Sequence, residues 1–211
     1  MSTVIRNAKE SEYRLTEEII REAFWNNFQP GADEHFVLHN LRTSADSIQE
    51  LDLVAEVDGR IVGSIVYSKS VIDNDHGLRK DVITFGPVGI LPEYQKRGLG
   101  EQLIKESILK ATGLGYPAIL IYGDPRYYHK FGFRCAEKFD ITREDGKYAV
   151  ALMALPLKEN ALANASGRFV ESESFKYAEK DLERFEENFV RKEKGYSKTQ
   201  DVFLILSSLA Y

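Results

Sequence analysis

The segment Val82–Gly100, VITFGPVGILPEYQKRGLG, constrains the fold more than any other part of the chain. It begins as an apolar run typical of a buried strand and ends in two glycines that open an amphipathic helix. Pro87 interrupts the run, and because proline has no N–H to give to a strand ladder, we expect a β-bulge there. The segment therefore predicts a bulged strand, a tight turn and a helix in direct succession.

The turn before the predicted helix has the pattern Q-x-x-G-x-G, from Gln95 to Gly100. Glycines at the start of a helix expose backbone N–H groups at the positive end of the helix dipole. A Cβ at Gly98 or Gly100 would hold an anion away from those groups. The pattern predicts a phosphate-binding loop, and it leaves open a plain helix entry in which the glycines serve close packing.

A second motif, Tyr127-Tyr128-His129-Lys130-Phe131-Gly132-Phe133, comes downstream of Gly123-Asp124-Pro125. Together with Val88-Gly89-Ile90 and the Q-x-x-G-x-G loop, it makes the chain resemble the GNAT N-acetyltransferases. Within that superfamily the chain is most similar to the YhbS-like branch of predicted acetyltransferases. The resemblance is good over residues 3–157 and loose in the remainder.

The resemblance implies an enzyme that transfers the acetyl group of acetyl-CoA to a small-molecule or peptide amine, which attacks the thioester directly. It implies that the N–H of Val88 or of a neighbour on the bulged strand stabilises the developing oxyanion, and that Tyr128 gives a proton to the leaving thiolate. That transfer, from a tyrosine to a thiolate of ordinary pKa, is uphill by about 2 kcal/mol, which is feasible. The acetyl-CoA contacts that it implies are Val88, Gly89, Ile90, Gln95, Lys96, Arg97, Gly98, Leu99, Gly100 and Asp124.

The sequence does not select a general base. Members of the family carry a carboxylate on the central strand, where this chain has Thr84, or on the next strand, where it has Ile119–Ile121. The substitutes left open are Glu34, Glu56, Asp81 and a chain of water molecules. We therefore expect an acceptor of low pKa, such as an α-amino group near about 8, or a carboxylate such as Glu34 acting through water.

Two other classes of function fit parts of the pattern. One is a non-catalytic acyl-CoA-binding or interaction module, in which the missing strand carboxylates reflect lost chemistry. The other is a nucleotide-phosphate binder, which is disfavoured because neither a P-loop Lys-Ser/Thr nor a ribose-binding acid at Rossmann spacing follows the glycines. Binding of CoA, ATP and NAD distinguishes these classes.

The sequence patterns that could indicate a metal site or a reactive thiol are weak. His35 and His39 are spaced to share a helix face, but a third zinc ligand is not evident and the residues between them are typical of a core. Asp73–Gly77 resembles the start of a calcium loop, but Thr84 stands where such a loop needs glutamate. Cys135 is typical of a small buried residue. We predict no metal.

Composition narrows the class of protein. The 211 residues are 43% hydrophobic and 29% charged, as in ordinary globular proteins. The formal net charge of −5 disfavours nucleic acid and anionic membranes as partners. A single cysteine fits a reducing compartment, and we recognise neither a signal peptide nor a membrane-spanning segment. These observations predict a cytoplasmic monomer or homodimer.

The hydrophobic spacing predicts an α/β fold, a mixed sheet of six or seven strands with helices on both faces. Asp58-Gly59 predicts a tight hairpin, and a second hairpin is expected between Phe133–Thr142 and Tyr148–Leu157. Helices are expected at Glu12–Phe28, after Asp33, at Gly98–Thr112, after Asp124 and at Ala178–Lys194. Strands are expected at Thr3–Ile5, Leu51–Val57, Ile61–Tyr67, Val82–Ile90 and Ala118–Tyr122, and a polar loop at Val71–Arg79.

The domain organisation is predicted as a GNAT-like domain at residues 1–157 and a mostly helical C-terminal extension at 158–211, packed on that domain. Val202–Leu209 reads as a final apolar helix, with a strand as the alternative. The resemblance implies that the two helices after the first strand form a lid over the acceptor. It also implies that Val82–Ile90 and Ala118–Tyr122 run parallel and splay apart at their C-terminal ends, where the pantetheine arm enters.

Overall fold

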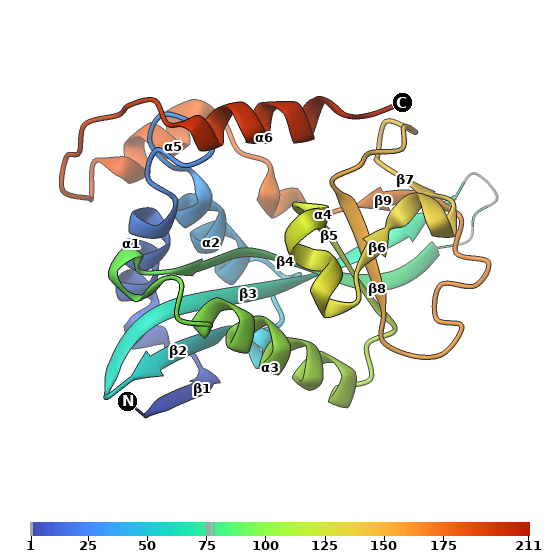
Figure 1. Ribbon diagram of the computed structural model, residues 1–211, viewed down its shortest axis with the longest axis horizontal. Helices are drawn as coiled ribbons and strands as arrows, with labels where there is room; N and C mark the ends of the chain where they lie inside the picture. The colour runs from blue at the N-terminus through green and yellow to red at the C-terminus, as the bar shows by residue number, and fades with distance from the viewer. Residues whose placement is uncertain (1, 75–76, 78) are drawn as a thin grey trace.

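The computed structural model describes residues 2–74, 77 and 79–211, which form a nine-stranded sheet with helices on both faces (Figure 1). The strands are β1 (Thr3–Asn7), β2 (Leu53–Val57), β3 (Arg60–Asp73), β4 (Arg79–Ile90), β5 (Ala118–Tyr122), β6 (Arg134–Cys135), β7 (Ile141–Thr142), β8 (Leu152–Pro156) and β9 (Gly167–Val170). The helices are α1 (Tyr13–Phe24), α2 (Glu34–Thr43), α3 (Leu99–Gly113), α4 (Pro125–Tyr128), α5 (Glu179–Glu186) and α6 (Lys198–Ser208). Asp75 and His76, part of the predicted polar loop and of its calcium-like pattern, lie outside the described residues.

The strands follow the order β1-β2-β3-β4-β5-β8-β6, and β9 pairs with both β3 and β7. The pairs β4–β5 and β7–β9 are parallel, and the others are antiparallel. The mixed α/β class is confirmed. The described residues form more strands than the six or seven predicted, because the expected strand Phe133–Thr142 is divided into β6 and β7, of two residues each, and because β9, of four residues, also joins the sheet. Strands this short show no alternation in a sequence.

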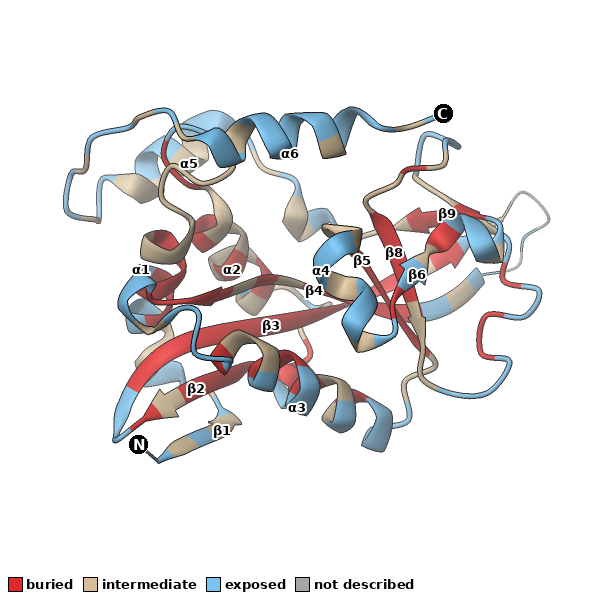
Figure 2. Ribbon diagram, viewed as in Figure 1, coloured by how far each residue is buried: buried red, intermediate tan, exposed pale blue. Residues whose placement is uncertain are grey.

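The two faces of the sheet carry separate cores. Ile65 and Tyr67 of β3 pack with Leu103 of α3, whereas Val66 between them packs with Ile20 of α1 and with residues of α2. Successive side chains of a strand point to opposite faces, so α3 covers one face and the α1–α2 pair covers the other. The strands are accordingly the most buried part of the molecule (Figure 2).

Several predicted elements are present with small changes in length. The Asp58-Gly59 hairpin is confirmed, and both of its turn residues have positive φ, 49° and 85°. The strand Ala118–Tyr122 is confirmed as β5. The hairpin of β3 and β4 extends into the predicted polar loop, because the two strands pair as far as Asp73 and Arg79. Long-range pairing therefore overrides the polar composition of that segment.

The predicted second hairpin is wrong in the later part of its first strand, Phe133–Thr142. β6 pairs with β8 in the expected antiparallel sense, but β7 pairs in parallel with β9. Asp140, between β6 and β7, has a left-handed conformation with φ 54°. This turn directs the chain away from β8, and β7 finds its partner in a segment that follows later in the sequence.

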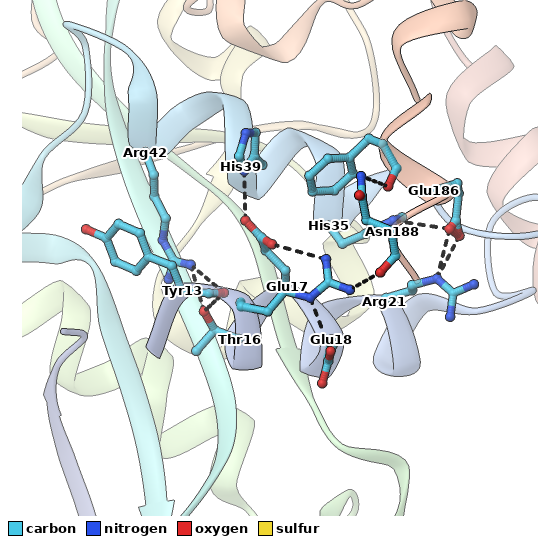
Figure 3. Close-up of polar contacts among 12 residues, drawn as sticks. Tyr13, Thr16, Glu17, Glu18, Arg21, His35, His39, Arg42, Glu186 and Asn188 are labelled. Carbon is cyan, nitrogen blue, oxygen red and sulfur yellow. Dashed lines mark hydrogen bonds and ion pairs between the residues drawn. The ribbon is translucent and has the colours of Figure 1, made fainter. Parts of the chain in front are cut away.

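The C-terminal segment docks on α1 through charged groups (Figure 3). Arg21 Nε lies 2.7 and 3.0 Å from the two carboxylate oxygens of Glu186. Arg14 donates to the carbonyl of Asn188, and Arg21 donates to that of Val190. α5 therefore ends before the predicted Lys194, because arginine side chains, rather than a further helical turn, satisfy these carbonyls. No helix in the described part of the chain has the length and apolar content needed to cross a membrane.

The two histidines of α2 have separate surroundings. His35 is fully buried between the rings of Phe185 and Phe189, and burial together with the nearby charges of Arg21 and Arg14 lowers its pKa to about 3. His39 Nδ1 lies 2.8 Å from a carboxylate oxygen of Glu17. Within the described ranges, His, Cys, Asp and Glu form no group of three or more that could hold a metal ion.

We expect Glu186→Gln to lower the free energy of unfolding by about 2 kcal/mol. Arg21 is only 4% exposed, and the substitution leaves its buried charge with neutral acceptors. Urea denaturation of the full chain measures the change. Glu187→Gln, an exposed neighbour, is the matched control and should change stability by less than about 0.5 kcal/mol. Equal losses in both variants would contradict a specific role for this ion pair.

Candidate active site

β4 and β5 separate at the centre of the sheet. They run parallel but share one register pair, Ile83 with Ile119. Further along β4, Gly86 and Pro87 stand opposite the single residue Val66 of β3, which is a bulge. This confirms both the predicted bulge at Pro87 and the predicted splay of the two strands.

The backbone of β4 beyond the bulge directs polar groups into the gap. The N–H of Leu91 donates to the carbonyl of Val62 on β3, and alternate residues of an antiparallel strand direct their groups to the same side. The N–H groups of Val88 and Ile90 consequently face the β5 side, where the ladder has ended. The Ile90 carbonyl accepts from the Gln95 side chain at 2.9 Å, as this orientation requires. We infer that the Val88 N–H is open to a ligand.

A cavity of about 1010 Å³ fills the gap between the strands. The residues that line it come from the bulge, the Q-x-x-G-x-G loop, the end of β5, α4 and the α1–α2 region. Arg97 is the one predicted site residue that does not line it. The Arg97 guanidinium donates to the Glu93 carbonyl at 2.7 Å and lies over the Tyr94 ring. The predicted residues that line the cavity are Val88, Gly89, Ile90, Gln95, Lys96, Gly98, Leu99, Gly100, Asp124 and Tyr128.

The N-terminus of α3 presents unpaired backbone donors to the cavity. The first bond of the helix runs from the Gln102 N–H to the Gly98 carbonyl at 2.9 Å. The N–H groups of Leu99, Gly100 and Glu101 therefore have no acceptor within the helix. The Lys96 ammonium forms no ion pair with the described residues. These groups make the edge of the cavity suitable for a phosphate.

A Cβ would fit without a clash at both glycines of the loop. A Cβ added to Gly98 would meet no atom within 4 Å, and one added to Gly100 would lie 3.6 Å from Ile90 Cγ1 and 3.8 Å from Tyr127 Oη. Gly98 also has φ +81°, which a side chain would strain. The space in front of both positions is evidence against the alternative that the glycines serve close packing.

Tyr128, at the end of α4, projects its ring between β4 and the residues after α4. Ring centroids lie 5.9 Å from Phe85 and 5.8 Å from Phe133. Burial, with smaller effects of Tyr127 and Asp124, raises the Tyr128 pKa above its ordinary value. The hydroxyl makes no hydrogen bond to the described residues, so it is a neutral donor that is free for a ligand. Full proton transfer to a thiolate is correspondingly more uphill than the ordinary pKa values indicate.

Gly123 fixes where the Tyr128 ring lies. A Cβ on Gly123 would be 2.4 Å from Tyr128 Cε2 and 2.5 Å from Cδ2. α4 itself starts in the predicted way, with the Asp124 side chain accepting the Arg126 N–H at 2.9 Å and Pro125 in the first turn.

The carboxylates named from the sequence lie in different places. Glu56 is ion-paired with Arg6 at 2.8 Å, on the outer part of the sheet. Asp81 lies near the start of β4, opposite Val71, and does not line the cavity. Glu34 does line the cavity, where burial and the charge of Asp33 raise its pKa well above the ordinary value.

Glu171 is the carboxylate that sequence reasoning missed. It directly follows β9, lines the cavity, and has no hydrogen bond or ion pair with the described residues. Burial, with the charge of Glu144 adding to it and that of Lys176 opposing it, raises the Glu171 pKa to about 7. No local pattern indicates this position, because only the pairing of β9 with β3 brings residue 171 to the site.

The motif-bearing part of the chain matches a known family. Residues 50–135 match the family model described as an acetyltransferase (GNAT) domain. The chain is also 28% identical over 142 residues to the uncharacterized N-acetyltransferase YhbS of Escherichia coli, an alignment that covers 67% of this chain and 81% of YhbS.

Two solved structures share the fold. One is the GNAT family N-acetyltransferase YhbS from Escherichia coli in complex with CoA, with TM-score 0.69 and 24% identity over 82% of this chain and 91% of that chain. The other is a GNAT family acetyltransferase from Brucella melitensis in complex with acetyl-CoA, with TM-score 0.65 and 24% identity over 83% and 99%.

Proposed function

We propose that the chain is a GNAT N-acetyltransferase and that it transfers the acetyl group of acetyl-CoA to a small-molecule or peptide amine. The observation that carries the proposal is the splay of β4 from β5 over a cavity whose edge is the unpaired N-terminus of α3. Such an arrangement accommodates an anion at the helix N-terminus and a reacting group between the strands.

The residues of the cavity fit acetyl-CoA, which when bound supplies the acetyl group as a thioester. We assign its phosphates to the N–H groups of Leu99–Glu101 and to the Lys96 ammonium, beside Gly98 and Gly100, where no side chain intervenes. The partly apolar lining between the strands suits the uncharged arm. Arg97 is assigned no contact, because its guanidinium is held by Glu93.

The proposed reaction is direct attack by the acceptor nitrogen on the thioester carbon. A nitrogen–carbon bond forms, the carbon–sulfur bond breaks, one proton leaves the nitrogen and one proton reaches the sulfur. We assign stabilisation of the negative charge on the carbonyl oxygen to the Val88 N–H. We assign donation to the sulfur to the Tyr128 hydroxyl, which its raised pKa keeps protonated.

Calorimetric titration of the purified protein with acetyl-CoA tests the proposal. We expect saturable binding with a Kd between about 1 μM and 1 mM, and no displacement by ATP or NAD. Absence of binding at millimolar acetyl-CoA would rule the function out. Binding without acetylation of any member of a broad amine panel would instead identify a non-catalytic acyl-CoA-binding module.

Gly123→Ala is expected to lower kcat about tenfold through displacement of the Tyr128 ring, while the Kd for acetyl-CoA changes little. Steady-state kinetics with an amine that the enzyme acetylates, and calorimetry with acetyl-CoA, measure the two quantities. Gly113→Ala at the end of α3 is the control, because its Cβ would meet nothing within 4 Å. An unchanged kcat in Gly123→Ala would show that the position of this ring is unimportant.

The expectation of a low-pKa acceptor depended on the lack of a carboxylate on either central strand. Glu34 and Glu171 both line the cavity, although neither comes from those strands. A strongly basic amine is therefore also compatible with the site.

A further inference from the structure

A second cavity of about 1010 Å³ adjoins the first beneath α6. The two spaces meet beyond the end of β5, where one set of residues lines both. These shared residues are Asn27, Phe28, Tyr122, Gly123, Asp124, Glu171 and Phe203. A molecule in the second cavity thus has direct access to the gap between β4 and β5.

α6 crosses the second cavity as a strap that is fixed at both ends. Before and at its start, Ser197 and Gln200 donate to the carbonyl of Asn26 at 2.6 and 3.1 Å. After its end, Tyr148 and Tyr211 exchange backbone hydrogen bonds of 3.0 Å. Figure 1 shows α6 running over the top of the molecule toward the C-terminus, and no residue of the helix is buried (Figure 2). The helix covers the second cavity instead of packing on a hydrophobic core.

The underside of the strap is apolar. Val202, Phe203 and Leu206 line the second cavity, and Phe203 stacks on Phe28 with ring centroids 4.8 Å apart. Leu204, on the same helix, is 67% exposed and lines neither cavity. The cavity therefore offers an aromatic and aliphatic wall to whatever enters it.

The charged groups of the second cavity are paired, with the exception of Glu171. Asp124 is ion-paired with Arg126 at 2.6 Å and Asp145 with Arg143 at 3.2 Å. Glu144 lies 3.4 Å from the Lys176 ammonium. Glu171 makes no such contact with the described residues, and it lies where the two cavities meet. A half-buried carboxylate without a cation is complementary to a positively charged ligand.

We propose that the second cavity is the acceptor site and that it takes a cationic primary amine on an apolar or aromatic body, with Glu171 as the proton acceptor. The inference rests on the proposed acetyl transfer. The ammonium gives one proton to the Glu171 carboxylate, which passes it to water. The neutral nitrogen then bonds to the acetyl carbon as the carbon–sulfur bond breaks. A second proton leaves the new amide nitrogen for water, and the sulfur receives the Tyr128 proton, which water replaces.

The ionisation of Glu171 suits this role. With a pKa raised to about 7, the carboxylate accepts a proton near neutral pH and releases it again. The charged and titratable groups around it are Glu144, which raises its pKa, Lys176, which lowers it, and Tyr122, Arg143, Asp145, Asp124 and Arg126 along the same cavity walls. Below about pH 7 Glu171 is protonated and its contribution to the rate is lost.

Three acceptors test the substrate class by release of free thiol from acetyl-CoA. We expect kcat/KM for 2-phenylethylamine to exceed that for ethanolamine at least about tenfold, because the ring is removed from water. Phenylalanine carries the same ring with a carboxylate that faces Glu171, and it should be as poor as ethanolamine. Phe203→Ala should remove the preference for 2-phenylethylamine, and the control Leu204→Ala should keep it. Equal rates for the three acceptors, or equal effects of the two variants, would overturn the assignment.

Glu171→Gln tests the proton acceptor. At about pH 8 we expect kcat/KM for 2-phenylethylamine to fall about 100-fold, with Glu187→Gln as the control that keeps its activity. The ratio of wild-type to Glu171→Gln rates should decrease toward one below about pH 7, because ionisation of the amine itself affects both enzymes equally. The role of Glu171 would be overturned if the ratio of wild-type to Glu171→Gln rates did not change with pH. It would also be overturned if Glu34→Gln, rather than Glu171→Gln, removed the pH dependence.

Calorimetry with acetyl-CoA separates this inference from the function on which it rests. Glu171→Gln and Phe203→Ala should bind acetyl-CoA with the wild-type Kd. Failure of the wild-type protein to bind acetyl-CoA would reject the proposed function. Normal binding combined with the contrary acceptor results would reject the acceptor site alone.

Discussion

Gly100→Glu is expected to raise the Kd for acetyl-CoA more than about 1,000-fold, or roughly 4 kcal/mol. Gly100 is the second residue of α3, and its N–H has no acceptor within the helix. A Cβ fits there without a clash, 3.6 Å from Ile90 Cγ1, so the protein should fold. The carboxylate would then occupy the proposed phosphate position and repel the anion that a helix N-terminus attracts.

Calorimetric titration and thermal denaturation measure this effect together. Gly113→Glu is the matched control, because it adds the same charge to the other end of α3, where a Cβ meets nothing within 4 Å. It should leave acetyl-CoA affinity unchanged. Gly98→Glu is expected to abolish binding as well, but φ +81° at Gly98 adds a strain of about 1 to 2 kcal/mol to the folded state. Unchanged affinity in Gly100→Glu would mean that the loop is only a helix entry.

Tyr128→Phe is expected to lower kcat about 1,000-fold while the Kd for acetyl-CoA stays within about twofold of the wild type. The phenylalanine ring keeps the contacts with Phe85 and Phe133 and removes only the hydroxyl. Because that hydroxyl makes no hydrogen bond to the described part of the chain, its loss leaves no buried partner unsatisfied. The effect should therefore fall on the chemical step rather than on stability.

Single-turnover kinetics with saturating acetyl-CoA measure that step. Tyr116→Phe, another partly buried tyrosine packed against the main core, is the control and should keep its activity. Wild-type kcat in Tyr128→Phe would assign Tyr128 to the core alone. The sulfur would then have to take its proton from water or from another residue.

The local geometry of the part of the site that we propose for acetyl-CoA was largely predictable from the sequence, because its signals are local. Gly98 lies where the backbone has a left-handed conformation, which favours glycine. Pro87 has no N–H to donate, so it lies outside the regular hydrogen-bond ladder of the strands. Asp124 and Pro125 mark a helix start by their own side chains. Each of these residues acts on its immediate neighbours, so a single stretch of sequence is sufficient evidence.

The part of the site that we propose for the acceptor was not predictable, because its residues come together from distant parts of the sequence. β9 reaches the sheet by pairing with β3 and β7, and that pairing alone brings Glu171 to the end of β5. α6 shows an apolar sequence typical of a packed helix or strand, yet it roofs a cavity because its ends are bonded to Asn26 and Tyr148. The two central strands carry no carboxylate at the expected positions, and no pattern on them indicates Glu171.

The sequence by itself therefore determined the bulged strand, the phosphate-type loop and the position of Tyr128 in its motif, since glycine, proline and capping residues restrict the backbone where they stand. The tertiary structure alone decided which carboxylate lies at the junction of the two cavities and what covers it. Those properties depend on burial and on strand pairing between distant segments. The free energies of burial and of pairing depend on residues that are far away in the sequence, so no local pattern indicates them.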